Sequence, residues 1–299
     1  MRNNTMMPDN PAYTHCSLCN EPINPSQPDN FGQVRGNIEG YLEEQFPLWK
    51  CPGCQAIHSL KPVDYNEIYS RYPLNERKLD IFARGTLKNL LKRLQKAGLK
   101  KTDRILDYGC GNGVMVKFLK QQEYKNVAGW DPYVPGWKER PNGTFDCVIA
   151  NDVIEHVDDP RAMMKDALSL VNPGGLLYVG TADSEGVENM ADLEKHIMRL
   201  HQPYHRVVLT QAGLMKLGEE LGLEPLACWR RSYMDRLVPF SNYRFLDEFN
   251  RALGHNMNMA LKPDAGKIMA KRPILWFWAF FGYFFPSAYE PAAVWRHQA

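Results

Sequence analysis

Four of the seven cysteines are arranged in a pattern that can bind a metal ion. They form two Cys-x-x-Cys pairs, made by Cys16 with Cys19 and Cys51 with Cys54. A two-residue gap in a tight turn lets both sulfurs of a pair point inward, so two pairs can supply the four thiolates of a closed, structural Zn²⁺ site. Two unrelated pairs of reactive or buried thiols are the alternative. His15 and His58 flank the pairs and are possible substitute ligands.

A second candidate site lies in a glycine-rich turn. The apolar run 104–108 leads into Gly109, Gly111 and Gly113, and a helical pattern begins at Val114. A strand, a glycine turn and a helix in this order indicate the first crossover of a doubly wound α/β sheet. Val114 replaces the small residue of a dinucleotide fingerprint, and no Lys-Ser/Thr follows as in a P-loop. The turn therefore predicts a close approach of the backbone to a different ligand.

Further landmarks follow at the ends of later predicted strands. Asp131 ends the strand 126–130, where a carboxylate can accept hydrogen bonds from both hydroxyls of a ribose. The strand 145–150 enters Asn151, and a turn followed by a strand covers 172–179. Apolar strands separated by helical stretches predict a parallel sheet with its ligand at the carboxyl ends.

These landmarks together resemble class I S-adenosylmethionine-dependent methyltransferases over about residues 102–227. The resemblance implies a doubly wound, seven-stranded, Rossmann-like sheet, shortened because the segment 132–144 is too short for the usual helix and third strand. It implies that Asp107 faces the amino end of S-adenosylmethionine and that Asp131 holds its ribose. The cofactor-binding residues implied in this way are Asp107, Gly109, Gly111, Asn112, Gly113, Asp131, Pro132, Asn151, Asp152, Val153 and His156.

The zinc module narrows the resemblance and supplies catalytic candidates. The fragment 46–54 is similar to the end of the zinc-binding domain of bacterial deoxysugar C-methyltransferases, which carry a Tyr-His-Glu-His signature. Here Tyr204 and His205 match its first half, whereas Arg206 and Val207 depart from it, which argues against C-methylation of a keto-sugar. Histidine titrates near neutral pH, so we predict His205 as the base and Tyr204 as the residue that orients the acceptor. A buried histidine before the helix 210–220 is the alternative.

The residues after 228 form an extension with an unusual aromatic segment. The segment 274–285 holds eight aromatic residues and no charge, and Lys267, Lys271 and Arg272 precede it. As a helix it is too short to span a bilayer, but it suits an interfacial membrane helix. A buried helix, a dimer contact and a pocket wall are the alternatives.

Composition limits the remaining choices. The chain has 299 residues and a formal net charge of +2, which argues against a nucleic-acid partner. No secretory signal is recognisable at the start, so we expect a cytoplasmic protein, with peripheral membrane contact through 274–285. The expected parts are a tail (1–14), a zinc-binding module (15–66), connecting helices (67–100), a methyltransferase domain (101–228) and a C-terminal cap (229–299).

The predicted function is methyl transfer from S-adenosylmethionine to a small-molecule, glycan or lipid-linked acceptor. O-methylation is favoured over C- or N-methylation, and the expected bound groups are S-adenosylmethionine and structural Zn²⁺. An RNA methyltransferase with a zinc module is one alternative. A scaffold that binds the cofactor without turnover is another.

Overall fold

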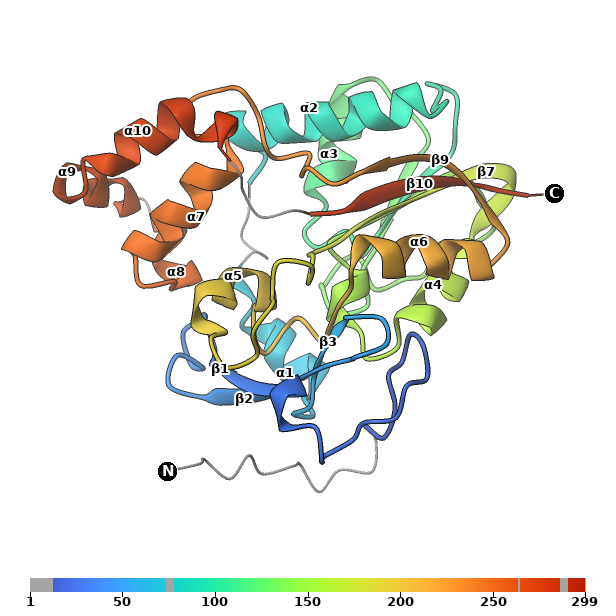
Figure 1. Ribbon diagram of the computed structural model, residues 1–299. Helices are drawn as coiled ribbons and strands as arrows, with labels where there is room; N and C mark the ends of the chain where they lie inside the picture. Colours follow the sequence, from blue (N-terminus) through green and yellow to red (C-terminus); the bar gives the residue numbers. More distant parts are fainter. Residues whose placement is uncertain (1–12, 74–77, 263, 286–289, 299) are drawn as a thin grey trace.

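The computed structural model describes residues 13–73, 78–262, 264–285 and 290–298. The predicted tail 1–14 lies outside these residues except for its last two positions. Figure 1 shows a central sheet with helices on both faces, a small N-terminal module below it and a helical unit to one side. The fold is therefore of the α/β class.

The central sheet has six strands in the order β5-β4-β6-β7-β10-β9. The strands, in chain order, are β4 (Ile105–Tyr108), β5 (Val127–Trp130), β6 (Phe145–Asn151), β7 (Val171–Gly180), β9 (Leu223–Trp229) and β10 (Ala292–His297). The first four pair in parallel, and β10 is antiparallel to both of its neighbours. The segment 132–144 contains neither a helix nor a strand, so the sheet lacks one strand of the seven-stranded type, as expected from its length.

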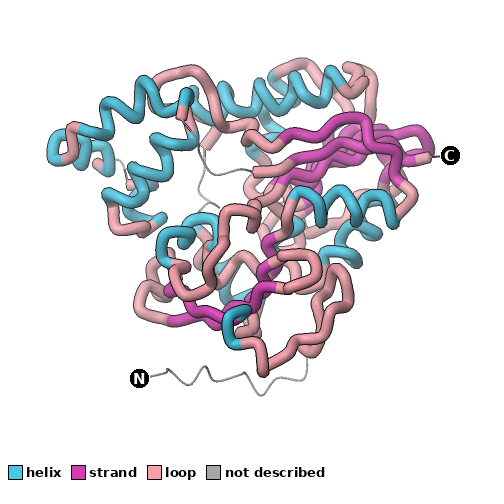
Figure 2. The backbone as a smooth tube through the Cα atoms, in the orientation of Figure 1, coloured by secondary structure: helices cyan, strands magenta, loops and turns pink. Residues whose placement is uncertain are grey.

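Helices cover both faces of this sheet (Figure 2). They are α2 (Ile81–Lys96) and α3 (Val114–Gln121) on one face, and α4 (Pro160–Leu168) and α6 (Gln211–Glu220) on the other. Successive side chains of a strand point to opposite faces. In β6, Cys147 and Ile149 accordingly join the core beneath α2 and α3, whereas Val148 and Ala150 join the core beneath α4 and α6. Burial on both faces explains why this strand is a continuous apolar run.

The C-terminal region differs from the prediction. The expected boundary at 228/229 does not mark the end of the sheet, because β10 inserts between β7 and β9. The cap is thus an insertion between two sheet strands. It contains α7 (Tyr243–Ala252), α8 (Met257–Ala260), η5 (Ala265–Lys267), α9 (Ile268–Lys271), α10 (Ile274–Phe281) and η6 (Gly282–Phe284), and Figure 1 shows these beside the sheet. The sequence pattern of the sheet ends at β9, and nothing near β9 indicates that another strand of the same sheet follows about 60 residues later.

The N-terminal module is built on a second, antiparallel sheet in the order β1-β2-β3-β8. Its elements are η1 (Pro28–Asn30), β1 (Phe31–Arg35), β2 (Gln45–Lys50) and β3 (Ile57–Ser59), followed by α1 (Tyr65–Ser70). The fourth strand, β8 (Val207–Val208), comes from the predicted methyltransferase region, after η3 (Ile154–His156), η4 (Glu194–His196) and α5 (Ile197–Leu200). The two regions therefore share a sheet, which fixes the chain immediately after His205.

Arg206 joins the two regions through a fully buried side chain. Its guanidinium forms a 2.9 Å ion pair with Asp158 and donates to the Ser59 hydroxyl, the Lys61 carbonyl and the Tyr13 hydroxyl. A buried charge needs such partners, because losing water without them is costly. Arg206, which interrupts the signature in the sequence, is thus an anchor between the module and the sheet.

Candidate functional site

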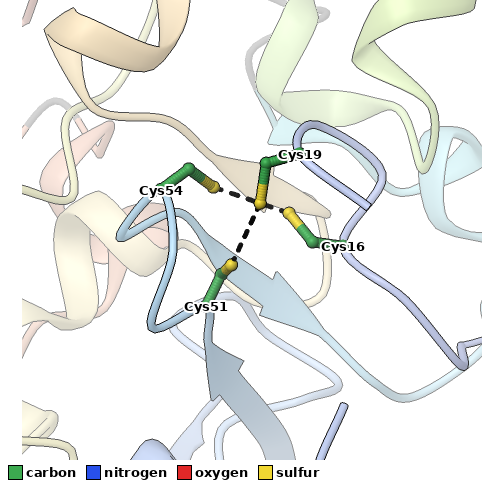
Figure 3. A group of neighbouring side chains, drawn as sticks. All are labelled: Cys16, Cys19, Cys51 and Cys54. Atoms are coloured by element: carbon green, nitrogen blue, oxygen red, sulfur yellow. Dashed lines mark hydrogen bonds between the residues drawn. The ribbon is translucent and has the colours of Figure 1, made fainter. Parts of the chain in front are cut away.

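The four cysteines of the predicted metal site converge (Figure 3). The Sγ atoms of Cys16 and Cys54 lie 3.5 Å apart, and those of Cys19 and Cys51 lie 3.4 Å apart. A tetrahedron with Zn–S bonds of about 2.3 Å has edges of about 3.8 Å, so small shifts would admit the ion. The donor set of four sulfurs therefore fits Zn²⁺ and leaves no open position for a substrate.

The surroundings of the sulfurs also fit a structural metal site. Hydrogen bonds with Cys16 and Cys54 lower the pKa of the Cys51 thiol well below its usual range, while the same network raises the pKa values of Cys16 and Cys54, so the thiols need a bound cation to ionise together. Nε2 of buried His58 lies 3.2 Å from Cys16 Sγ. His58 is thus placed to support a ligand rather than to replace one. His15 instead contacts Thr14 at an exposed position.

A cavity of about 560 Å³ opens at the carboxyl ends of β4, β5 and β6. Its size is that of a pocket for a nucleoside-sized ligand. Gly109 and Gly111 line it with positive φ values of +72° and +52°. A Cβ on Gly109 would lie 2.5 Å from Val153, whereas a Cβ on Gly111 would meet open space. The turn thus leaves room for a ligand beside the backbone.

Asp131 stands at the end of β5 on the wall of this cavity. Its carboxylate accepts hydrogen bonds from the backbone N–H groups of Gly111, at 3.0 Å, and Tyr133, at 2.9 Å. It therefore ties the glycine turn to the segment after β5. Oδ1 also accepts from the Val134 N–H, at 3.2 Å, so Oδ2, which has one protein donor, keeps a further lone pair that can accept a bond from a ligand hydroxyl.

The structure separates the predicted cofactor-binding residues into two groups. Those that line the cavity are Gly109, Gly111, Asp131, Pro132, Asp152, Val153 and His156. Those that do not line it are Asp107, Asn112, Gly113 and Asn151. Asp107 is buried, and burial together with the charge of Asp131 raises its pKa to about 8. Gly113 packs toward Trp137, and Asn151 donates to Asp152 and Tyr233.

A wall of tyrosines completes the cavity and was not expected from the sequence. Tyr65 and Tyr69 of α1 stack on Tyr133, with ring centroids 5.8 and 4.6 Å apart. The Tyr65 hydroxyl donates to Asp158, and the Tyr69 hydroxyl lies 2.9 Å from His156 Nδ1. Trp130, next to Asp131, lines the same space. The helix α1 thus forms one side of this first cavity, and flat aromatic faces suit a purine or a sulfonium cation.

A second, smaller cavity of about 270 Å³ adjoins the first. Tyr72, Asp152 and His156 line both cavities, so the two meet at these side chains. The wall of the second also includes His201, His205 and residues of the insertion, such as Tyr243 and Leu246 of α7. A cofactor in the first cavity and an acceptor in the second would be neighbours.

The hydrogen bonds of two histidines at the wall of this second cavity indicate which ring nitrogen carries the proton. His205 Nδ1 lies 2.7 Å from the Arg199 carbonyl oxygen, which can only accept, so Nδ1 carries the proton. His201 Nδ1 lies 2.8 Å from Asn37 Oδ1, which leaves its Nε2 as the acceptor. Burial lowers the pKa of His205 to about 4, so its ring is neutral at pH 7. Nε2 therefore has a free lone pair in each ring.

Glu155 adds a carboxylate to this cluster. One carboxylate oxygen of Glu155 and one ring nitrogen each of His156 and His205 all lie within 4.8 Å of one another. Glu155 is buried and accepts a hydrogen bond from the Ala182 N–H, and burial raises its pKa to about 7. Glu155 can therefore exchange a proton near neutral pH, whereas burial lowers the pKa values of His156 and His205 and keeps both rings neutral.

Tyr204 does not have the position predicted for it. Its side chain is fully buried, its hydroxyl donates to the Ile68 carbonyl, and it lines neither cavity. It packs beneath α1, with its ring 4.5 Å from Tyr72. Because β8 pairs with β3 just after it, the short segment 204–206 directs Tyr204 into the core and leaves His205 at a cavity wall.

Comparisons with known proteins agree with this geometry. Residues 79–227 match a family described as "Methyltransferase domain". A ubiquinone biosynthesis O-methyltransferase of Xanthomonas euvesicatoria is 29% identical over 44% of this chain, and the match spans 55% of that relative, little more than half its length. Its counterpart from Xylella fastidiosa strain 9a5c is 29% identical over 68% of this chain and 79% of its own.

Among solved structures, magnesium protoporphyrin IX methyltransferase from Synechocystis PCC 6803, with bound S-adenosylhomocysteine, aligns at a TM-score of 0.43. The identity is 15%, over 80% of this chain and 90% of that one.

A doubly wound sheet with a glycine turn and an acid at the ends of its first two parallel strands defines a nucleoside-binding α/β domain. The family match makes the assignment specific. Residues 79–227 form a class I S-adenosylmethionine-dependent methyltransferase domain.

Proposed function

We propose that this protein transfers a methyl group from S-adenosylmethionine to a hydroxyl oxygen of a small-molecule or lipid-linked acceptor. The observation that carries the proposal is the junction of the two cavities, with His205, a neutral histidine, on the wall of the second. The relatives named as ubiquinone biosynthesis O-methyltransferases also favour oxygen as the acceptor atom.

The residues that would hold S-adenosylmethionine are those around the first cavity. Asp131 would accept bonds from the ribose hydroxyls, and Gly109 and Gly111 would leave space for the backbone approach. The stacked Tyr69 and Tyr133 would face its flat or cationic groups. When bound, S-adenosylmethionine supplies a methyl group that is already activated for displacement.

The chain's own part in the reaction is alignment and removal of one proton. Alignment of two reactants contributes about 7–11 kcal/mol to rate acceleration. His205 Nε2 would accept the acceptor's O–H proton as the oxygen–carbon bond forms and the carbon–sulfur bond breaks. The Glu155 carboxylate, within 4.8 Å of the His205 ring nitrogen, would stabilise the resulting imidazolium. His201, on the wall of the second cavity, would help to shape the acceptor site.

The cysteine site would hold a structural Zn²⁺. All four sulfurs belong to the protein, so this ion would take no part in the reaction. Its contribution would be to fix the sheet that includes β8, and with it the position of His205.

Radiolabelled S-adenosylmethionine and a set of catechols, anilines and thiophenols of equal size test the proposal. We expect label transfer to the catechols, with mass spectrometry locating the methyl group on oxygen. His205→Gln can still donate to the Arg199 carbonyl but has no basic nitrogen, so kcat should fall by about 10²–10⁴-fold with cofactor affinity unchanged. His297→Gln is the matched control, because His297 lies on β10 outside both cavities and should turn over normally.

Wild-type turnover in His205→Gln would remove His205 as the base. Label on nitrogen or sulfur alone would contradict O-methylation.

A further inference from the structure

One face of the C-terminal insertion is strongly apolar and open to solvent. In α10 and the following turn, exposed fractions are 49% for Trp276, 53% for Phe281 and 68% for Phe284. Ile274, Phe277, Phe280 and Phe285 are also at least 40% exposed. We call these seven residues the aromatic face. Monomeric proteins rarely expose so many large apolar side chains side by side, so a partner for this surface is expected.

The aromatic face is held rigidly by the rest of the insertion. Leu275 and Ala279 on the opposite side of α10 are buried against Phe245 of α7. The Asn242 side chain donates to the backbone carbonyls of Trp278 and Ala279. The loop before α7 extends the apolar surface, since Phe240 packs 5.8 Å from both Trp276 and Phe280, and nearby Leu237 is 61% exposed.

Charge indicates the chemistry of the partner. The segment 274–285 carries no charged residue, while Lys267, Lys271 and Arg272 stand just before it with a single acid, Asp264. All three cations are exposed, and within the described part of the chain Lys271 and Arg272 form no ion pair. Tryptophan and phenylalanine beside lysine and arginine are typical of proteins that lie in the headgroup region of an anionic bilayer. No helix in the described ranges is long and apolar enough to cross a membrane.

We infer that the aromatic face and its three cations bind the surface of an anionic lipid membrane. The insertion also links this surface to the proposed acceptor cavity. Tyr243, Leu246 and Asn250 of α7 line that cavity, and Phe245 of the same helix packs on α10. Docking through α10 therefore brings a wall of the acceptor cavity close to the bilayer. Membrane docking would favour a lipid-linked acceptor. This conclusion rests on the proposed function, because it takes the second cavity as the acceptor site.

Flotation of the full-length, metal-loaded protein with vesicles tests the surface itself. We expect the protein to float with phosphatidylglycerol–phosphatidylcholine vesicles and to remain at the bottom with phosphatidylcholine alone. Phe281→Ser/Phe284→Ser should weaken binding by about tenfold or more, because two exposed rings no longer enter the interface. Lys271→Glu/Arg272→Glu should weaken it by about 25-fold or more, since each cation near an anionic surface contributes about fivefold.

The matched control is Met259→Ser/Leu261→Ser. These side chains are 36% and 49% exposed. They lie outside the aromatic face, at the end of the insertion where α8 contacts Asn37 of the N-terminal module. Vesicle binding of this variant should therefore match that of wild type. Wild-type protein that does not float, or an aromatic-face variant that floats like wild type, would overturn the inference. So would a dimer, seen by sedimentation velocity, that Phe281→Ser/Phe284→Ser abolishes while vesicle binding is absent. Flotation involves no methyl transfer, so its failure is distinct from failure of the proposed reaction.

Discussion

Replacement of Arg206 by methionine tests whether the metal module and the sheet are joined as described. Methionine keeps the apolar stem but removes the guanidinium, which donates to Asp158, Tyr13, Ser59 and Lys61 at 2.8–2.9 Å. Asp158 is 39% exposed and keeps water and tyrosine donors, whereas the Ser59 and Lys61 acceptors become unsatisfied. Each such group costs about 1–3 kcal/mol, and loss of the ion pair itself adds at most about 1 kcal/mol because Asp158 stays in contact with water. We expect the free energy of unfolding to fall by about 3–5 kcal/mol.

Urea denaturation of metal-loaded protein, followed by circular dichroism, measures this loss. Arg71→Met is the matched control, because the Arg71–Glu67 pair is 3.9 Å long and both side chains are 59% exposed. Such a pair contributes little, so the control should stay within about 0.5 kcal/mol of wild type. A loss below about 1 kcal/mol in Arg206→Met would refute the anchor.

The difference in free energy of unfolding between wild type and Arg206→Met should also depend on pH, which is a second check on Arg206. Burial opposes ionisation of Asp158, but the Arg206 charge and the hydrogen bonds from Tyr65 and Tyr13 outweigh it and hold the pKa of Asp158 below its usual value. A depressed carboxyl pKa stabilises the fold above the unfolded pKa of about 3.9 and loses that effect as pH falls through the folded pKa. The difference between wild type and Arg206→Met should therefore be constant from pH 5 to 8 and shrink below about pH 4.

Three further predictions concern the cavities and the metal site. Gly109→Ala places a Cβ 2.5 Å from Val153 at a φ of +72°, so calorimetry should show cofactor binding weakened by about tenfold or more. Burial lowers the pKa of His205 to about 4, so urea titrations should show stability falling from about pH 6.5 to pH 4, less steeply in His205→Gln. Chelation of the metal should lower Tm by as much as Cys51→Ser does, whereas Cys228→Ser, outside the cluster, should respond to chelator like wild type.

Each of these predictions has a contrary outcome. Unchanged cofactor affinity in Gly109→Ala would place the ligand elsewhere. If the free energy of unfolding of His205→Gln falls with pH as steeply as that of wild type, the ring of His205 is not buried in its neutral form. A Tm that stays unchanged when the chelator removes the zinc would show that the four cysteines fold the module without metal.

The features that sequence predicts best here are those with fixed local spacing. The two Cys-x-x-Cys pairs converge, and the glycine turn lies between a strand and a helix with all three glycines at positive φ. Both depend on geometry set within a few residues. The position of Asp131 is predictable for a similar reason. It ends β5, which pairs in parallel with β4, so it must lie beside the glycine turn that follows β4.

The features that sequence misses depend on contacts between distant segments. Tyr65 and Tyr69 carry no motif, and they form the cavity wall only because α1 folds back over the end of β5. Strand β10 is separated from β9 by the insertion, so no local pattern connects them. Tyr204 and Arg206 adjoin His205 at the wall of the second cavity, yet they point into the core because β8 pairs with a strand about 150 residues earlier. Only tertiary packing decides which side chain of such a short segment faces a cavity.

Calorimetric titration of the metal-loaded full-length protein with S-adenosylmethionine tests the central claim most directly. The account predicts one site of micromolar affinity, competed by S-adenosylhomocysteine and weakened by about tenfold or more in Asp131→Ala, where the ribose acceptor is lost. Absence of binding to folded protein with one zinc per chain would contradict it. Binding that Asp131→Ala leaves unchanged would contradict the placement of the ligand in this cavity.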